Sequence, residues 1–93
     1  MSNISILKSP GDIELEIAAR VKKRRKEKKI TQKGLSVRSA VSLGSIKRFE
    51  RLGEISLSSL IRISFALDCV EDFDNLFAKK GYSSIQEVID EQR

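Results

Sequence analysis

The sequence contains no histidine, no tryptophan and only one cysteine among its 93 residues. Because histidine is the commonest general base, its absence excludes most hydrolase designs. The single cysteine, Cys69, has no partner for a disulfide within the chain, and without histidine no zinc site is expected. We therefore expect no catalytic residues, no metal and no cofactor, and we interpret the chain as a binding module rather than an enzyme.

Long apolar runs are missing as well. No stretch approaches the roughly 18 apolar residues of a membrane-spanning helix, and Met1–Lys8 lacks the basic start and apolar centre of a signal peptide. We therefore expect a cytoplasmic protein that makes no membrane contact. With 40% apolar and 33% charged residues, residues 1–93 are expected to form one small domain around one modest core.

Positive charge is concentrated in the first part of the chain. Residues 1–67 carry 15 basic and 6 acidic residues, a net charge of +9, whereas residues 68–93 carry 3 basic and 7 acidic residues, a net charge of −4. Nine of the fourteen residues in Arg20–Lys33 are Lys or Arg, and Glu27 is the only acid among them. Such a run can be a solvated helix face, but one dominant sign favours a polyanion partner, most commonly nucleic acid. A membrane surface is the weaker alternative, since the run lacks an apolar face with Trp or Phe.

Residues that cap helices recur at short intervals, and apolar residues follow them at helical spacing. The expected helices are one from Pro10 to about Lys28, others at about 32–38, 43–51 and 57–67, a short one containing Phe73 and Phe77 that stops near Gly81, and one from Ser84 to about Glu91. Strand-like alternation never runs beyond a few residues. We therefore predict an all-α fold, and the short connections imply a compact bundle of orthogonal helices.

The helix expected at 43–51 has two chemically different faces. Projected at 100° per residue, one face carries basic or very small side chains, which are Gly44, Lys47, Arg48 and Arg51. The opposite side carries Ser45, Ile46 and Phe49 and is mostly apolar. Such a helix suits the major groove of DNA, where a glycine in the first turn allows close approach. Taken alone, the pattern also describes an ordinary amphipathic helix. The neighbouring sequence therefore has to distinguish that interpretation from a DNA-binding helix.

That context is a long basic helix, a short capped helix and the turn Ser39-Ala40-Val41 before it. The stretch Ile30-Thr31-Gln32-x-x-Leu35, followed by Val41-Ser42-x-x-Ser45-Ile46-x-x-Phe49-Glu50-Arg51, resembles the helix-turn-helix of the Cro/C1-type (XRE) repressor family. The resemblance covers about Ile17 to Leu67. It implies a five-helix, lambda-repressor-like DNA-binding core at 9–70, with the recognition helix at about 43–51, and leaves an acidic helical extension at 71–93.

The resemblance also implies which residues bind DNA. Gln32 matches a glutamine that bonds a backbone phosphate and supports the first base-reading side chain. Arg48 occupies a base-facing position, and its natural target is the O6 and N7 edge of guanine. The full implied DNA-binding set is Gln32, Ser42, Leu43, Gly44, Ser45, Lys47, Arg48 and Arg51. Arg25 and Glu50 match a structural ion pair that fixes the recognition helix on the first helix.

The sequence departs from the family pattern at four positions. Ala40 stands where the turn often has glycine, so a positive φ there would be strained. Gly34 replaces an acid that would complete a capping box. Leu43 and Gly44 are base-facing but not polar, so direct readout would depend heavily on Arg48, and DNA shape would supply part of the selectivity.

Other features have plainer interpretations. Cys69 is expected to be a small buried hydrophobe. The acids at 71–74 are expected to begin a helix rather than to bind a cation. The aromatic side chains are expected in the core rather than as base-stacking platforms, because they lack the strand setting that single-strand binders use; they are Phe49, Phe65, Phe73, Phe77 and Tyr82. The acidic C-terminal third can extend the core, form a dimer contact or receive a basic partner.

We therefore predict a sequence-selective double-stranded DNA-binding protein, most simply a transcriptional repressor. One such domain buries only about 600–1,000 Å² on DNA, so a homodimer on an inverted repeat is expected. The main alternative is an antitoxin that neutralises a partner toxin protein and represses its own operon, which a toxin-like neighbouring gene would indicate. A further alternative is an accessory factor that bridges DNA-bound proteins without reading bases.

Overall fold

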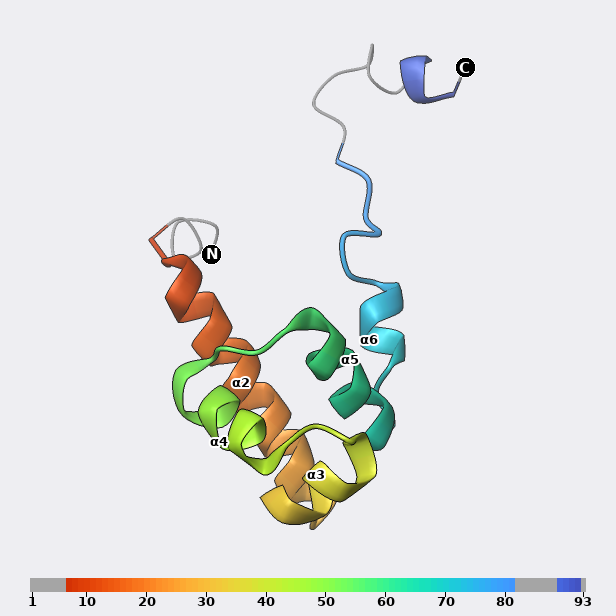
Figure 1. Ribbon diagram of the computed structural model, residues 1–93. Helices are drawn as coiled ribbons and strands as arrows, with labels where there is room; N and C mark the ends of the chain where they lie inside the picture. The colour runs from red at the N-terminus through yellow and green to blue at the C-terminus, as the bar shows by residue number, and fades with distance from the viewer. Residues whose placement is uncertain (1–6, 82–88, 93) are drawn as a thin grey trace.

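The computed structural model describes residues 7–81 and 89–92, and all regular secondary structure within them is helical (Figure 1). The helices, in chain order, are α2 (Pro10–Glu27), α3 (Gln32–Ser39), α4 (Leu43–Leu52), α5 (Leu57–Ala66) and α6 (Glu71–Asp74). Residues 89–91 are also helical, whereas most of the helix expected from Ser84 lies outside the described residues. The all-α prediction is confirmed. No helix in the described part of the chain is both long and apolar enough to cross a membrane.

Side-chain caps begin the four longer helices where the sequence places them. Ser9 and Asp12 form a complete capping box at the start of α2, with bonds of 3.0 and 3.1 Å. The Thr31 Oγ1 atom accepts a hydrogen bond from the Gly34 amide at 2.9 Å, and Ser42 and Ser56 cap α4 and α5 in the same way. Each cap contributes roughly 1 kcal/mol by satisfying an amide that the helix leaves unpaired.

The core lies where α3, α4 and α5 meet, with α2 packed across α4. Its largest fully buried side chains are Leu35, Ile46, Phe49, Ile63 and Leu67. Since Ile46 and Phe49 sit on one side of α4, that helix is held to the body by its apolar side. Its other side is free to face a partner.

Each of the four longer helices is followed by a residue with left-handed backbone, at Lys29, Ala40, Gly53 and Asp68. Gly53 ends α4 with φ of +80°, and a Cβ added there would lie 2.9 Å from the Glu14 carbonyl carbon of α2. Ala40 ends α3 with φ of +59°, which bears out the strain expected if this turn needed a positive φ. An L-residue in this region costs about 1–2 kcal/mol, and glycine avoids that cost.

The prediction that the aromatic side chains are core residues is wrong for two of them. Phe49 is buried and Phe73 half-buried, but Phe65 is 64% and Phe77 95% exposed, and Tyr82 lies outside the described residues. The buried positions of α5 are Ile63 and Ser64, and at 3.6 residues per turn residue 65 projects from the opposite side.

The expected fifth helix is shorter than predicted and ends at Asp74, well before Gly81. It has no side-chain cap, and none of its four residues is buried. Short helices are marginal without packing, and after Asp74 the chain continues in isolated turns rather than as a helix. Phe77 therefore lies beyond the helix, in a segment that runs away from the body (Figure 1).

Two of the left-handed positions, Gly53 and Ala40, predict opposite responses to exchanging alanine and glycine. Gly53→Ala should destabilise the fold by about 2–4 kcal/mol, because it combines backbone strain with a clash against α2. Ala40→Gly should stabilise it by about 0.5–1 kcal/mol, because the relieved strain outweighs the added freedom of the unfolded chain. Urea denaturation followed by circular dichroism measures both. A Gly53→Ala chain as stable as the parent would contradict the close contact between α4 and α2.

Candidate nucleic-acid interface

The α3–turn–α4 unit presents one face of α4 to solvent. Most of the predicted DNA-binding residues are exposed, and Leu43 is half-buried. The exposed ones are Ser42, Gly44, Ser45, Lys47, Arg48 and Arg51. Ser45 is exposed although the helical projection placed it on the mostly apolar side. Around Gly44 there is open space, with no atom within 4 Å of an added Cβ. The first turn of α4 is therefore accessible to a flat or grooved surface.

The turn between α3 and α4 is held by two serine hydroxyls. Ser36 Oγ donates to the Val41 carbonyl at 2.6 Å, and the Val41 amide donates to Ser39 Oγ at 3.2 Å. Both backbone polar groups of the buried Val41 are thus satisfied despite the strained Ala40 before it. Such bonds fix the angle at which α4 leaves α3, which determines where its exposed face points.

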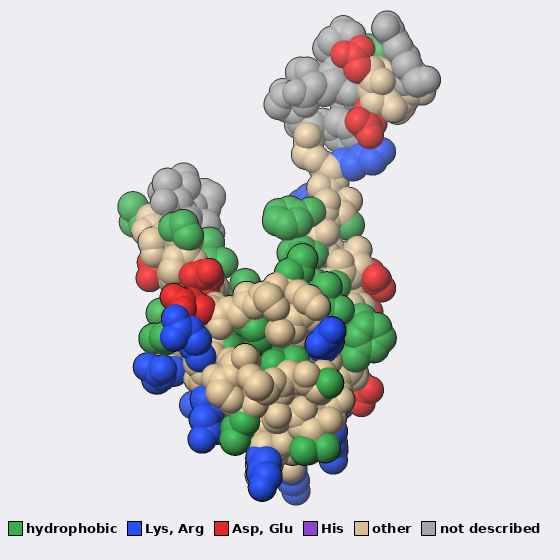
Figure 2. Space-filling view, in the orientation of Figure 1, with side chains coloured by type: hydrophobic (Ala, Val, Ile, Leu, Met, Phe, Trp, Pro, Cys, Tyr) green, Lys and Arg blue, Asp and Glu red, His purple; other side chains and the backbone are tan. Residues whose placement is uncertain are grey.

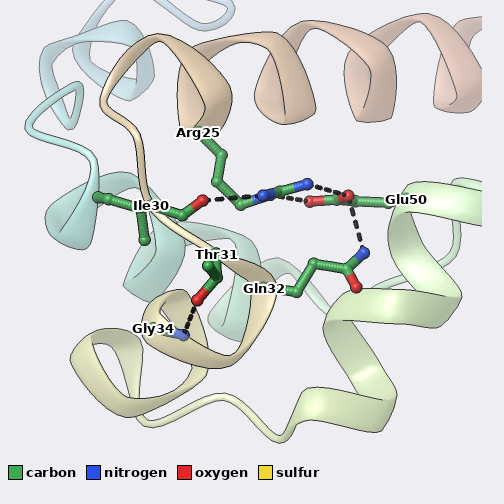
Figure 3. Close-up of polar contacts among 6 residues, drawn as sticks. All are labelled: Arg25, Ile30, Thr31, Gln32, Gly34 and Glu50. Carbon is green, nitrogen blue, oxygen red and sulfur yellow. Dashed lines mark hydrogen bonds and ion pairs between the residues drawn. The ribbon is translucent and has the colours of Figure 1, made fainter.

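A buried ion pair joins α4 to α2 (Figure 3). Arg25 Nε and Nη2 donate to the two carboxylate oxygens of Glu50 at 2.7 and 3.0 Å. The two side chains are only 9% and 4% exposed. Arg25 Nη1 also donates to the Ile30 carbonyl at 2.8 Å, so the same guanidinium fixes the loop that leads into α3. The structure therefore brings together the two residues that the sequence paired.

Gln32 has a partner that the sequence did not indicate. Its Nε2 donates to Glu50 Oε1 at 3.0 Å (Figure 3), so the first residue of α3 belongs to the buried network. An amide nitrogen carries two hydrogens, and the second stays free to donate. Gln32 can therefore hold Glu50 and still offer a donor to a phosphate.

The network lowers the pKa of Glu50. Burial alone would raise that pKa, but hydrogen bonds from Arg25 and Gln32, together with the charges of Arg25 and Lys22, outweigh it. The carboxylate is therefore ionised throughout the physiological pH range. Among the described residues, no buried side-chain polar atom lacks a hydrogen-bond partner.

Sequence reasoning also missed the partner of Arg48. Arg48 Nη2 donates to Glu54 Oε1 at 2.5 Å, across the turn that Gly53 makes at the end of α4. Both side chains are more than half exposed. Spacing alone gives no signal for this pair, since six residues separate the two along the chain and only the left-handed glycine between them brings them together.

Basic side chains line the left and lower edges of the helical body in Figure 2. On α3, Lys33 and Arg38 are exposed, as are most basic residues of the last turns of α2. The acidic side chains in this view lie mainly above the basic ones and along the right edge. The charge asymmetry of the sequence thus persists on the surface, and this face is suited to bind a polyanion.

No protein-family model, curated protein or solved structure matches this chain. The functional assignment of this face therefore depends on its residues and their arrangement alone.

The buried pair predicts a large stability loss when one partner is neutralised. Glu50→Gln leaves the Arg25 charge buried without its counter-ion, so we expect a loss of about 3–5 kcal/mol. Arg25→Lys should also destabilise, because an ammonium cannot donate to both carboxylate oxygens and to Ile30 in the fixed geometry of a guanidinium. Urea denaturation at pH 7 measures both effects. Glu16→Gln, which removes a half-exposed partner of Lys8, is the control and should cost less than 1 kcal/mol.

The effect of Glu50→Gln should also depend on pH. The folded-state pKa of Glu50 is lowered. Its contribution to the free energy of unfolding is therefore fully present above the unfolded-state pKa, and it is lost as the pH falls through the folded-state pKa. The stability difference between parent and variant should therefore be largest near neutral pH and should narrow below about pH 4.5. A difference that stays constant on acidification would show that Glu50 is not stabilised as a carboxylate.

Proposed function

We propose that this chain binds double-stranded DNA sequence-selectively through α4 in the major groove, with a helix-turn-helix of the Cro/C1 type, and represses transcription. The observation that carries the proposal is the pairing of an exposed basic face on α4 with a buried Arg25–Glu50 bond that fixes this helix on the body. A recognition helix has to be held rigidly, since base contacts depend on placing side-chain atoms within hydrogen-bonding distance.

The residues along α4 fit the requirements of a groove. The major groove admits a helix, and the open space at Gly44 lets the helix approach the bases closely. Arg48 is long enough to reach a guanine edge, and Leu43, half-buried at the start of the helix, suits a thymine methyl. Lys47, Arg51 and the basic end of α2 would neutralise phosphates on both sides.

We further propose that the protein acts as a homodimer on an inverted repeat. An apolar groove of about 310 Å³ lies between α2, α5 and α6, and Leu76 lines it. The next residue, Phe77, is 95% exposed. A second copy can bury both features reciprocally about a two-fold axis, which fits a twofold-symmetric operator.

The second candidate function is that of an antitoxin. The same apolar groove could receive a toxin protein instead of a second copy of this chain, and α4 would still bind DNA. A toxin-like gene beside this one favours that function, and competition between the toxin and dimer formation would establish it.

DNA binding predicts a specific loss for Arg48→Ala. We expect binding to the protein's own upstream duplex to weaken about 5- to 150-fold, the value of a bidentate arginine–guanine contact of about 1–3 kcal/mol. Fluorescence anisotropy across a salt series, with a scrambled duplex beside the native one, measures this. Arg62→Ala removes an exposed arginine from α5 and is the matched control, with little change expected. If both duplexes bind equally and salt weakens both, the protein binds DNA by charge alone and the proposed sequence selectivity is wrong.

The dimer predicts that Leu76→Ser and Phe77→Ser shift the protein towards monomer. Each replaces an exposed apolar side chain at the proposed contact by a polar one, without removing core packing. Sedimentation velocity at micromolar concentration, with and without DNA, measures the oligomeric state. Val37→Ser changes another exposed apolar residue, on α3, and should leave the dimer intact. A protein that stays monomeric even on its operator would refute the dimer.

A further inference from the structure

The exposed Arg48–Glu54 pair places a carboxylate on the side chain that the proposed function assigns to base reading. Arg48 Nη2 and Glu54 Oε1 are 2.5 Å apart, and the two side chains are 58% and 54% exposed. Neither side chain is held by burial, in contrast to Glu50 on the other side of α4 and its partner Arg25 from α2. The Arg48 guanidinium is therefore retained by a contact that a stronger acceptor can displace.

The backbone under Glu54 has little freedom to move away. Gly53 adopts φ of +80° and lies so close to Glu14 and Leu15 of α2 that a Cβ would have to displace their backbone. The half-buried Ile55, which follows Glu54, packs against the core. The backbone of Glu54 is consequently held at the end of α4, within reach of Arg48.

Two kinds of DNA contact compete differently with this pair. An exposed ion pair shifts an equilibrium by about five-fold or less. A single phosphate offers Arg48 a contact of similar strength, since it is another exposed ion pair that salt weakens. A guanine edge binds the same group through two hydrogen bonds and discriminates about 5- to 150-fold. The guanine contact therefore displaces Glu54 fully and bears the whole cost of breaking the pair, whereas on non-target DNA Arg48 can stay with Glu54.

We propose that Glu54 is a specificity-determining residue that acts through Arg48. On non-target DNA its carboxylate keeps the Arg48 guanidinium from the phosphates, and a correctly placed guanine draws that group away. The inference rests on the proposed DNA-binding function and adds a restraint on Arg48 to it. Glu54 is thus a positioning residue that lowers specific affinity more than non-specific affinity, because only the guanine contact has to break the pair completely.

The test compares Glu54→Gln with the parent on the native and scrambled duplexes. We expect the variant to bind the native duplex up to about five-fold more tightly and the scrambled duplex at most about three-fold more tightly, so that selectivity rises. Because Arg48 becomes available to one more phosphate, the slope of log K against log salt for the scrambled duplex should steepen by about 0.9. Fluorescence anisotropy across a salt series measures both quantities.

Glu71→Gln is the matched control, because it makes the same chemical change at an exposed residue of α6, which Figure 1 places away from α4. It should leave selectivity and the salt slope unchanged. The double variant Arg48→Ala with Glu54→Gln separates the two possible roles of the carboxylate. If Glu54 acts through Arg48, Glu54→Gln changes neither selectivity nor slope once Arg48 is absent.

Two results would overturn the inference while leaving DNA binding in place. One is unchanged selectivity and slope in Glu54→Gln. The other is tighter binding of both duplexes that persists in the Arg48→Ala background, which would mean that Glu54 merely repels phosphates. If the unsubstituted protein binds neither duplex, the proposed function itself fails, and the role of Glu54 fails with it.

Discussion

The orientation of α4 depends on one buried interaction, the two-point bond between Arg25 and Glu50. All three nitrogens of the Arg25 guanidinium donate hydrogen bonds within the protein, two to Glu50 and one to the Ile30 carbonyl. Through Gln32 the same carboxylate also holds the start of α3. Four segments thus converge on one pair of charges. An apolar contact could bind them as tightly, but it would not fix the rotation of α4 about its own axis so specifically, because dispersion forces are not directional.

The ends of the helices supply the second constraint. The turns after α3 and α4 are two of the four helix ends with left-handed backbone, and the one after α3 uses alanine and the one after α4 glycine. At Gly53 no other residue fits, since α2 occupies the space of a side chain. At Ala40 there is only conformational strain, which the hydroxyls of Ser36 and Ser39 offset by bonding the neighbouring Val41. The first position is fixed by packing and the second by local hydrogen bonds.

These distinctions explain which features the sequence could predict. Helix starts follow from local chemistry, so Ser9, Thr31, Ser42 and Ser56 were sufficient to locate them. The Arg25–Glu50 pair came from the resemblance alone, because no local rule joins residues 25 positions apart. The exposure of Phe65 and Phe77 could not be predicted, since aromatic side chains favour cores in general and only the packing of α5 and the early end of α6 decide otherwise. The Arg48–Glu54 contact depends on the direction of the turn at Gly53.

The two Arg–Glu pairs that meet on α4 show how burial decides what a charge pair can do. Glu50 and Arg48 are two residues apart, and at 100° per residue they point to different sides of the helix. The pair at Glu50 is at most 9% exposed, and the pair at Arg48 is more than half exposed. Removing one partner from the first leaves a buried charge, so the pair persists and the helix stays fixed. In the second, water can replace either partner at little cost, so the pair can exchange with an external anion. The same kind of Arg–Glu pair thus fixes α4 on its buried side and forms an exchangeable contact on its exposed side.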